Sequence, residues 1–136
     1  DMEKNAIPFV DAEHEAFYYE NIRRCWIDDC YHKALVYCLG ISEDTRRNVD
    51  RIFDFQMNVI KPECLKEGWI TSGSQMVIYL AFNLYTDTMP TVQERSRKQD
   101  QIRESRRYSV SDIFACNYAR YFWVAVQIRY PEYCRG

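Results

Sequence analysis

The chain has 136 residues, of which 47% are hydrophobic and 15% aromatic, and its formal net charge is −2. This length and apolar content suit one domain with a single core and exclude a chain that is disordered throughout. A net charge so close to zero gives no general attraction to nucleic acid or to anionic lipid.

The first two predicted helices begin at aspartates. Asp11 can cap a helix that runs to residue 25, with further acidic residues in the first turn. Asp28 and Asp29 start a second helix with an apolar stripe, which we expect Gly40 to end in a left-handed conformation.

Ser42 can cap a third helix, whose apolar spacing continues to residue 60. Pro62 breaks this pattern, since the residue before a proline avoids the α region, and residues 62–66 can add one turn. No long alternating run and no Asn-Gly or Asp-Gly turn occurs, so we expect no strands.

Residues 69–85 form the most apolar stretch of the chain. Ser72 and Gln75 have the spacing of a capping box at its start. The helix that follows is apolar almost all round except for a stripe of Gln75, Tyr79 and Asn83, which predicts a buried central helix. It is too short to span a bilayer, which takes about 20 apolar residues, so we expect no membrane association.

Residues 86–107 are polar and form a predicted mobile, partly helical excursion. Between residues 94 and 107, six positive side chains outnumber three negative ones. Arginine can grip phosphate or carboxylate groups, which suggests an acidic protein or nucleic acid as partner, but the excess is also compatible with a solvated loop. The positive residues are Arg95, Arg97, Lys98, Arg103, Arg106 and Arg107.

Ser109 and Asp112 predict a second capping box, before a helix that runs to residue 129 and stops at Pro131. Its aromatic and aliphatic residues fall on one side, and Trp123 falls on the other, with Arg120 beside it. Trp123 is therefore either an interface residue or a contact to a second layer of the bundle. The sequence as a whole predicts an all-α fold: a single compact bundle of five or six helices, with its core in residues 10–85 and 108–131.

The six cysteines show no Cys-x-x-Cys spacing, and the first nine residues contain no apolar run that could serve as a signal peptide. We therefore expect reduced thiols in a cytoplasmic protein.

With these motifs assembled, the chain resembles a family of short uncharacterised bacterial proteins found in Firmicutes, their phages and mobile elements. The likeness is carried by His14-Glu15, residues 34–40 and 60–62, Gly68-Trp69, residues 80–85 and 121–123, and residues 129–131. The family is a domain of unknown function, so the resemblance implies a bacterial or phage setting but no activity and no site residues.

Three alternative sites follow from the spacing of polar residues. Asp11 with His14, and Asp29 with His32, each place a carboxylate and an imidazole on one helix face, as a metal site requires, although caps and surface histidines explain the same pattern. A cysteine-based enzyme would need Cys25, Cys30 or Cys64 close in space to one of these histidines, which is a weak signal in a chain with six cysteines. A weak anion site could form at the start of the central helix from Thr71, Ser72, Gly73 and Ser74, residues that ordinary capping also explains.

The sequence therefore favours an interaction protein that binds a protein or nucleoprotein partner through Trp123, Arg120 and the basic excursion, with self-association as a further option. The resemblance implies a modulator of a host defence or regulatory complex. We expect no cofactor. The alternative is a small metal-dependent or cysteine-based enzyme.

Overall fold

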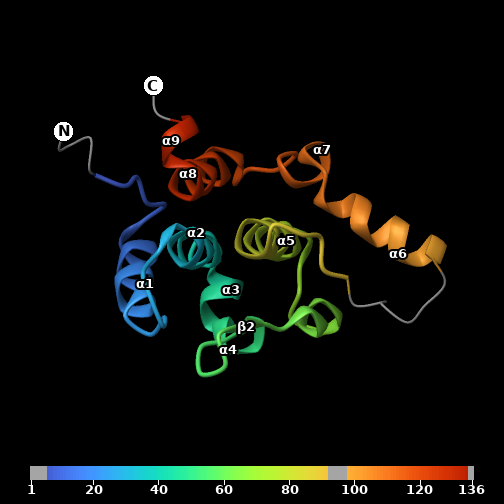
Figure 1. The fold of residues 1–136 in the computed structure, drawn as a ribbon, viewed down its shortest axis with the longest axis horizontal. Helices are drawn as coiled ribbons and strands as arrows, with labels where there is room; N and C mark the ends of the chain where they lie inside the picture. Colours follow the sequence, from blue (N-terminus) through green and yellow to red (C-terminus); the bar gives the residue numbers. More distant parts are fainter. Residues whose placement is uncertain (1–5, 92–97, 135–136) are drawn as a thin grey trace.

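The computed structural model describes residues 6–91 and 98–134, and Figure 1 shows their arrangement. The helices are α1 (Ala12–Ile22), α2 (Cys30–Leu39), α3 (Glu43–Arg47), α4 (Val49–Ile52), α5 (Ser72–Thr86), α6 (Lys98–Ser105), α7 (Val110–Ile113), α8 (Ala119–Arg129) and α9 (Pro131–Cys134). The remaining elements are strands β1 (Phe53–Asp54) and β2 (Val59–Ile60) and the 3-10 turns η2 (Pro62–Lys66) and η3 (Arg106–Tyr108). The described part of the chain is thus mainly helical, as predicted.

Helices α2 and α5 lie side by side at the centre, with α1 beside α2 and α8 across α2 (Figure 1). All residues from 34 to 39 of α2 are at most 1% exposed. The predicted central helix, α5, is buried over residues 77–82 and at Leu84. The core is therefore centred on a pair of helices, and α2 is the more completely enclosed of the two.

Side-chain caps start most helices at or next to the predicted residues. Asp11, Asp29, Ser42 and Ser109 each accept a hydrogen bond from the backbone N–H three residues on. The predicted capping box of α5 is displaced by one residue, because Thr71 and Ser74, not Ser72 and Gln75, bond each other reciprocally.

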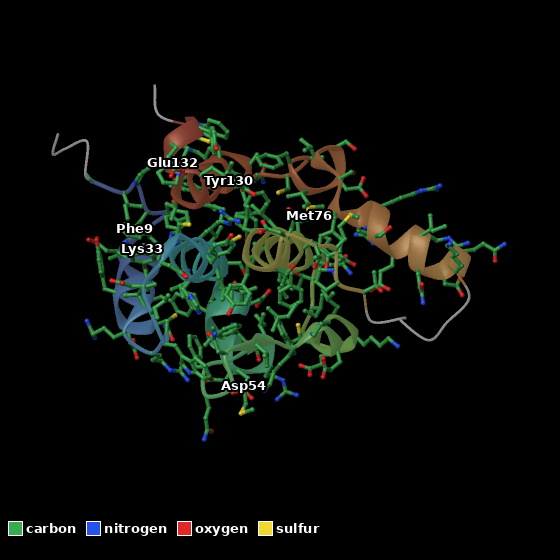
Figure 2. The ribbon with its side chains drawn as sticks, in the orientation of Figure 1. Phe9, Lys33, Asp54, Met76, Tyr130 and Glu132 are labelled. Carbon is green, nitrogen blue, oxygen red and sulfur yellow. The ribbon has the colours of Figure 1, made fainter. Side chains whose placement is uncertain are left out.

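The third predicted helix is wrong beyond Ile52, and the expectation of no strands is wrong with it. The chain turns there into a short antiparallel hairpin, in which Phe53 pairs with Ile60. The Asp54 carboxylate accepts from the N–H groups of Gln56 and Met57, which fixes the turn. Asn58 then adopts a left-handed φ of 62°, which asparagine tolerates better than most residues. In Figure 2, Asp54 lies on the side of the molecule opposite Tyr130 and Glu132.

The last predicted helix is interrupted. Helix α7 ends at Ile113 and α8 begins at Ala119. The residues between them, Phe-Ala-Cys-Asn-Tyr, are mostly weak helix formers. The interruption places the Tyr118 ring over the start of α5, where a Cβ built on Gly73 would lie 3.3 Å from it. A tertiary contact therefore accompanies the break in the helical pattern.

Gly40 ends α2, but not by a left-handed conformation, since its φ is −84°. Its small size matters instead. A Cβ at this position would lie 2.6 Å from the His14 ring and 2.8 Å from the Phe17 ring. The absence of a side chain lets α1 approach the end of α2.

Arg129 connects α8 to the other two central helices. Its Nε donates to the Leu84 carbonyl at 2.9 Å, and one terminal nitrogen contacts both carboxylate oxygens of Asp87 at 2.8 and 3.0 Å. Its guanidinium also lies 3.6 Å from the centre of the Tyr31 ring on α2. The Arg129 cation therefore interacts both with the C-terminal end of α5, where the helix dipole is negative, and with the face of the Tyr31 ring on α2.

Within the described residues, every helix falls short of the length and apolar character that a bilayer-spanning segment needs.

Candidate functional site

Trp123 lies on α8 with half of its surface exposed. Phe122, Ala125 and Arg129 of the same helix are buried, and α8 packs mainly on α2. Arg120 is exposed one turn before Trp123, with its guanidinium 5.2 Å from the centre of the Tyr121 ring. Of the two predicted environments for Trp123, the outward-facing one fits this position.

The other two tryptophans differ from Trp123. Trp69 is partly buried and donates its indole N–H to Glu67 at 2.6 Å, so it is tied into the fold. Trp26 is 63% exposed, but it lies on the connection between α1 and α2. Trp123 therefore combines a large exposed apolar surface with the rigid backbone of a core helix.

The structure separates the predicted basic residues into two groups. Arg95 and Arg97 lie outside the described residues. Lys98, Arg103, Arg106 and Arg107 lie on α6 and η3, and all four are exposed. The mobility of the excursion stays a prediction.

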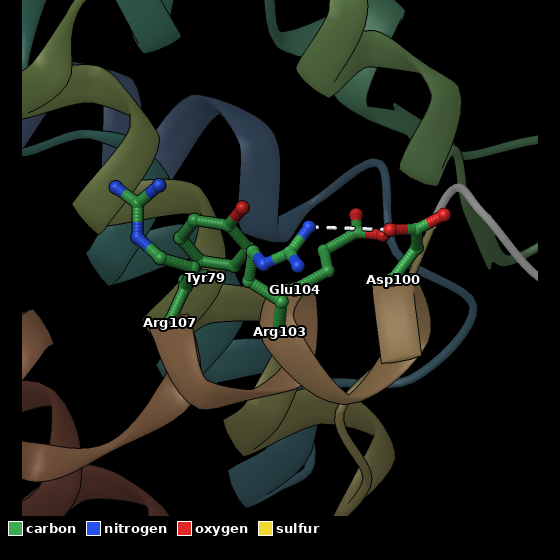
Figure 3. A pocket seen from close by; sticks show the side chains of 5 residues that line it. All are labelled: Tyr79, Asp100, Arg103, Glu104 and Arg107. Atoms are coloured by element: carbon green, nitrogen blue, oxygen red, sulfur yellow. Dashed lines mark hydrogen bonds and ion pairs between the residues drawn. The ribbon is translucent and has the colours of Figure 1, made fainter. Parts of the chain in front are cut away.

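Two of these arginines line a pocket between α5 and α6, with a volume of about 220 Å³ (Figure 3). Arg107 donates to the Gln75 side chain at 2.8 Å, and Arg103 pairs with Asp100 at 3.2 Å. Tyr79 forms the apolar wall, and burial raises the pKa of its phenol. Glu104 completes the lining.

This pocket has both signs of charge, two guanidinium groups and two carboxylates. An incoming anion would have to compete with Asp100 for Arg103. The ion pair itself is exposed and adds little stability. The pocket lies where α6 and η3 meet α5. The predicted polar stripe of α5 therefore faces the basic segment at Gln75 and Tyr79.

His32 is 5% exposed and lies in a network that joins α2, the hairpin and α5. Its Nδ1 is 2.8 Å from an Asp29 carboxylate oxygen, and its Nε2 is 2.7 Å from the Asn58 side-chain oxygen. The Tyr85 hydroxyl donates to the Asn58 carbonyl at 3.2 Å. Burial opposes ionisation of Asp29, but hydrogen bonds from the His32 backbone and ring hold the pKa of this carboxyl below its usual value.

His14 is fully buried between α1 and α2. Its Nδ1 accepts from the Val10 N–H at 3.0 Å, so its Nε2 carries the proton and donates to the Tyr37 carbonyl at 2.8 Å. Burial lowers the pKa of the imidazole below 6.5. The His14 ring is therefore neutral, and its two hydrogen bonds link the chain before α1 to α2.

The predicted metal alternative does not match this geometry. Asp11 and Asp29 are helix caps, and the two histidines are buried core residues with both ring nitrogens engaged, not the surface residues of the simpler interpretation. Among residues 6–91 and 98–134, no group of three or more His, Cys, Asp or Glu side chains could hold a metal ion.

The cysteine-based alternative requires a cysteine paired with a histidine, and among the described residues no hydrogen bond joins the two. The six cysteines are free thiols. Burial raises the pKa of Cys25 to about 11 and that of Cys64 to about 12, which keeps both protonated near neutral pH. Cys30 contacts Arg129 at 3.9 Å, whereas the histidine rings bond to other groups.

At the proposed anion site, the hydroxyl groups are already used. Thr71 Oγ1 accepts from the Ser74 N–H at 3.1 Å, and Ser74 Oγ accepts from the Thr71 N–H at 2.8 Å. Ser74 is 1% exposed. Ordinary capping therefore accounts for these residues, with Ser72 as the first helical residue and Gly73 under the Tyr118 ring.

Sequence reasoning missed Asn58 and Tyr85 in the network and Gln99 on α6. The first two come together only through the hairpin, which the sequence did not predict. Gln99 shares a spacing of i, i+3, i+4 and i+7 with Ile102, Arg103 and Arg106, a pattern that is visible in the sequence.

These features define a small, mainly helical domain with an exposed tryptophan on α8 and a basic segment formed by α6 and η3. The chain belongs to DUF6075, a family of unknown function, whose sequence model matches residues 4–136. No curated protein and no solved structure matches the chain.

Proposed function

We propose that this protein is an interaction module that binds a protein partner through the face of α8 that carries Trp123 and Arg120. The observation that supports it is the half-exposed indole of Trp123 on a helix whose opposite side is packed in the core. The fold does not need this exposure, because Phe122 and Ala125 already supply the contact with the core.

Tryptophan and arginine are the side chains most enriched among residues that dominate binding energy. Each combines a large contact area with a directed polar group. A rigid helix presents both with little loss of conformational entropy on binding. Trp123 and Arg120 therefore form the centre of the proposed surface.

The proposed setting is a bacterial cytoplasm, and the proposed partner is a component of a host defence or regulatory complex, protein or nucleoprotein. The six free thiols support a reducing compartment. The bacterial and phage context comes from the family resemblance. Gene neighbourhood tests it, because adjacency to phage or defence genes is expected and adjacency to metabolic operons would contradict it.

The experiment compares two matched tryptophan substitutions. Trp123→Ala removes the proposed anchor, and Trp26→Ala removes a tryptophan of similar exposure on a loop. A photo-crosslinking residue at position 127, one turn after Trp123 on α8, with the same residue at the exposed position 23 as control, identifies the partner by mass spectrometry. Sedimentation of the purified chain shows whether that partner is a second copy.

We expect Trp123→Ala and Arg120→Glu to abolish the crosslinked complex while leaving the melting temperature within a few degrees of wild type, and Trp26→Ala to retain the complex. A loss of roughly 3 kcal/mol in unfolding free energy for Trp123→Ala would identify a core residue instead. Equal crosslinking from positions 127 and 23 would also contradict the proposal.

A further inference from the structure

Four residues of α6 and of the start of η3 form one exposed side of this segment. Gln99, Ile102, Arg103 and Arg106 follow the i, i+3, i+4, i+7 spacing that places residues on one helix face. Together they line an open recess of about 260 Å³. Ile102 is 43% exposed, and the Arg103 side chain is 75% exposed.

The other side of the segment holds it to the bundle. Arg107 reaches Gln75 on α5, and Tyr79 faces Asp100 and Glu104 across the pocket of Figure 3. In Figure 1, α6 extends away from the central helices. None of its residues is buried. The recess therefore lies on the exposed part of this segment, and Arg103 borders both the recess and the pocket of Figure 3.

We propose that this outer face of α6 binds an acidic helical segment of a partner protein. An aliphatic side chain of the partner lies over Ile102 in the recess. One partner carboxylate contacts Arg106, and a second takes the place of Asp100 at Arg103. Guanidinium groups match carboxylates in a planar, two-bond geometry. Because carboxylates three or four residues apart share a helix face, one such segment can reach both arginines.

Charge and lining favour this occupant over nucleic acid. Residues 98–107 include four positive and two negative side chains, and the recess itself is lined by two arginines and no carboxylate. The whole chain is slightly acidic, with a net charge of −2, so the positive face is local. The four residues that line the recess include no aromatic side chain on which a base could stack. This surface is separate from the α8 face of the proposed function.

The test selects peptides against the folded full-length protein from a phage-displayed library of random short peptides. Binding of the enriched peptides is then measured by fluorescence anisotropy. The charge-reversal variant is Arg103→Glu with Arg106→Glu, and the matched control is Arg23→Glu with Arg47→Glu, two exposed arginines elsewhere. Circular dichroism confirms that both variants fold.

We expect enriched peptides to carry Asp or Glu around an aliphatic residue at helical spacing. Their affinity should fall about tenfold or more in the Arg103/Arg106 variant, which corresponds to two lost charge contacts, and change little in the control. Ile102→Ser should weaken the same peptides, and Arg103→Lys with Arg106→Lys should restore part of the affinity. Trp123→Ala should have no effect, which keeps this result independent of the α8 proposal.

Several outcomes would overturn the inference. Enriched peptides that are not acidic, or that bind the charge-reversal variant as well as wild type, would exclude this face. A short DNA duplex bound more tightly than any selected peptide, and lost in the same variant, would make nucleic acid the occupant. Self-association that disappears in this variant alone would assign the face to a second copy of the chain.

Discussion

The His14 side chain is a buried base whose pKa is lowered by burial, and this makes the fold sensitive to acid. The unfolded chain binds a proton near pH 6.5, and the folded chain binds it only at lower pH. The stability that His14 contributes is therefore fully present above pH 6.5 and is lost as the pH falls from 6.5 through the folded pKa.

We expect the unfolding free energy to drop between about pH 7.5 and about pH 5.5, by at most about 1.4 kcal/mol, because only one pH unit of this window lies below the unfolded pKa of 6.5. Urea unfolding of the wild type and of His14→Gln at both values measures this drop. The glutamine variant should be less stable but should lose less stability on acidification. The same drop in both chains would assign the acid sensitivity to other groups.

Gly40 should tolerate no side chain. Gly40→Ala places a methyl group 2.6 Å from a His14 ring that is hydrogen-bonded on both sides and cannot move freely. Overpacking of this kind costs about 1–3 kcal/mol, measurable by thermal or urea unfolding. Gly68→Ala is the control, since a Cβ there has no neighbour within 4 Å. Equal stability of the two variants would show that α1 can shift away from α2.

At the level of helices and strands, the sequence predicted those features that depend on interactions between residues close together in the chain. Asp11, Asp29, Ser42 and Ser109 bond a backbone group three residues away, so their helix starts are visible in the sequence. The hairpin depends on contacts of Asn58 with His32 and Tyr85, which lie about 26 residues away in either direction. No local pattern reports such contacts.

The candidate surfaces were predictable to different degrees. The outward direction of Trp123 followed from helical periodicity as one of two alternatives, because α8 packs on α2 with one side only. The burial of both histidines did not follow, since their partners Tyr37 and Asn58 come from other elements. Ile102 and its neighbours have the spacing of one helix face, but the high charge of this segment suggested a solvated loop instead.

Helix α6 should open early, because none of its residues is buried, a property that it shares with the four-residue helix α9. Limited trypsin digestion is expected to cut early at Lys98, Arg103 or Arg106, and the nicked protein should keep its helical circular dichroism signal. Early cleavage at Arg23 or Arg51, with residues 98–107 protected, would show that the basic segment is held more firmly than the connections around it.

On the scale of the whole molecule, Arg129 holds α2, α5 and α8 together. Arg129→Ala should lower the unfolding free energy by about 3 kcal/mol, because it removes hydrogen bonds to Leu84 and Asp87 and the contact with Tyr31. Arg129→Lys should cost less, since it keeps the charge but loses the planar fork.

Arg47→Ala is the control for this prediction. It removes an exposed ion pair with Glu43, and exposed pairs contribute about 0–1 kcal/mol. Chemical denaturation ranks the unfolding free energies of Arg129→Ala, Arg129→Lys and Arg47→Ala. If Arg129→Ala lowered the unfolding free energy no more than Arg47→Ala does, the Arg129 cation would contribute little to stability. The aliphatic packing of α8 on α2 would then hold these helices together.

The contacts of Arg129 also constrain the order in which a growing chain can fold on the ribosome. The α2 face that α8 covers is synthesised about 90 residues before Arg129, the residue that closes it (α2 ends at Leu39, and 129 − 39 = 90). Helices α1 and α2 can pair early through His14 and Tyr37, but α2 stays open on its other side until α8 emerges. During that interval the nascent chain exposes an apolar surface, the kind of surface that chaperones recognise and that aggregates when unprotected.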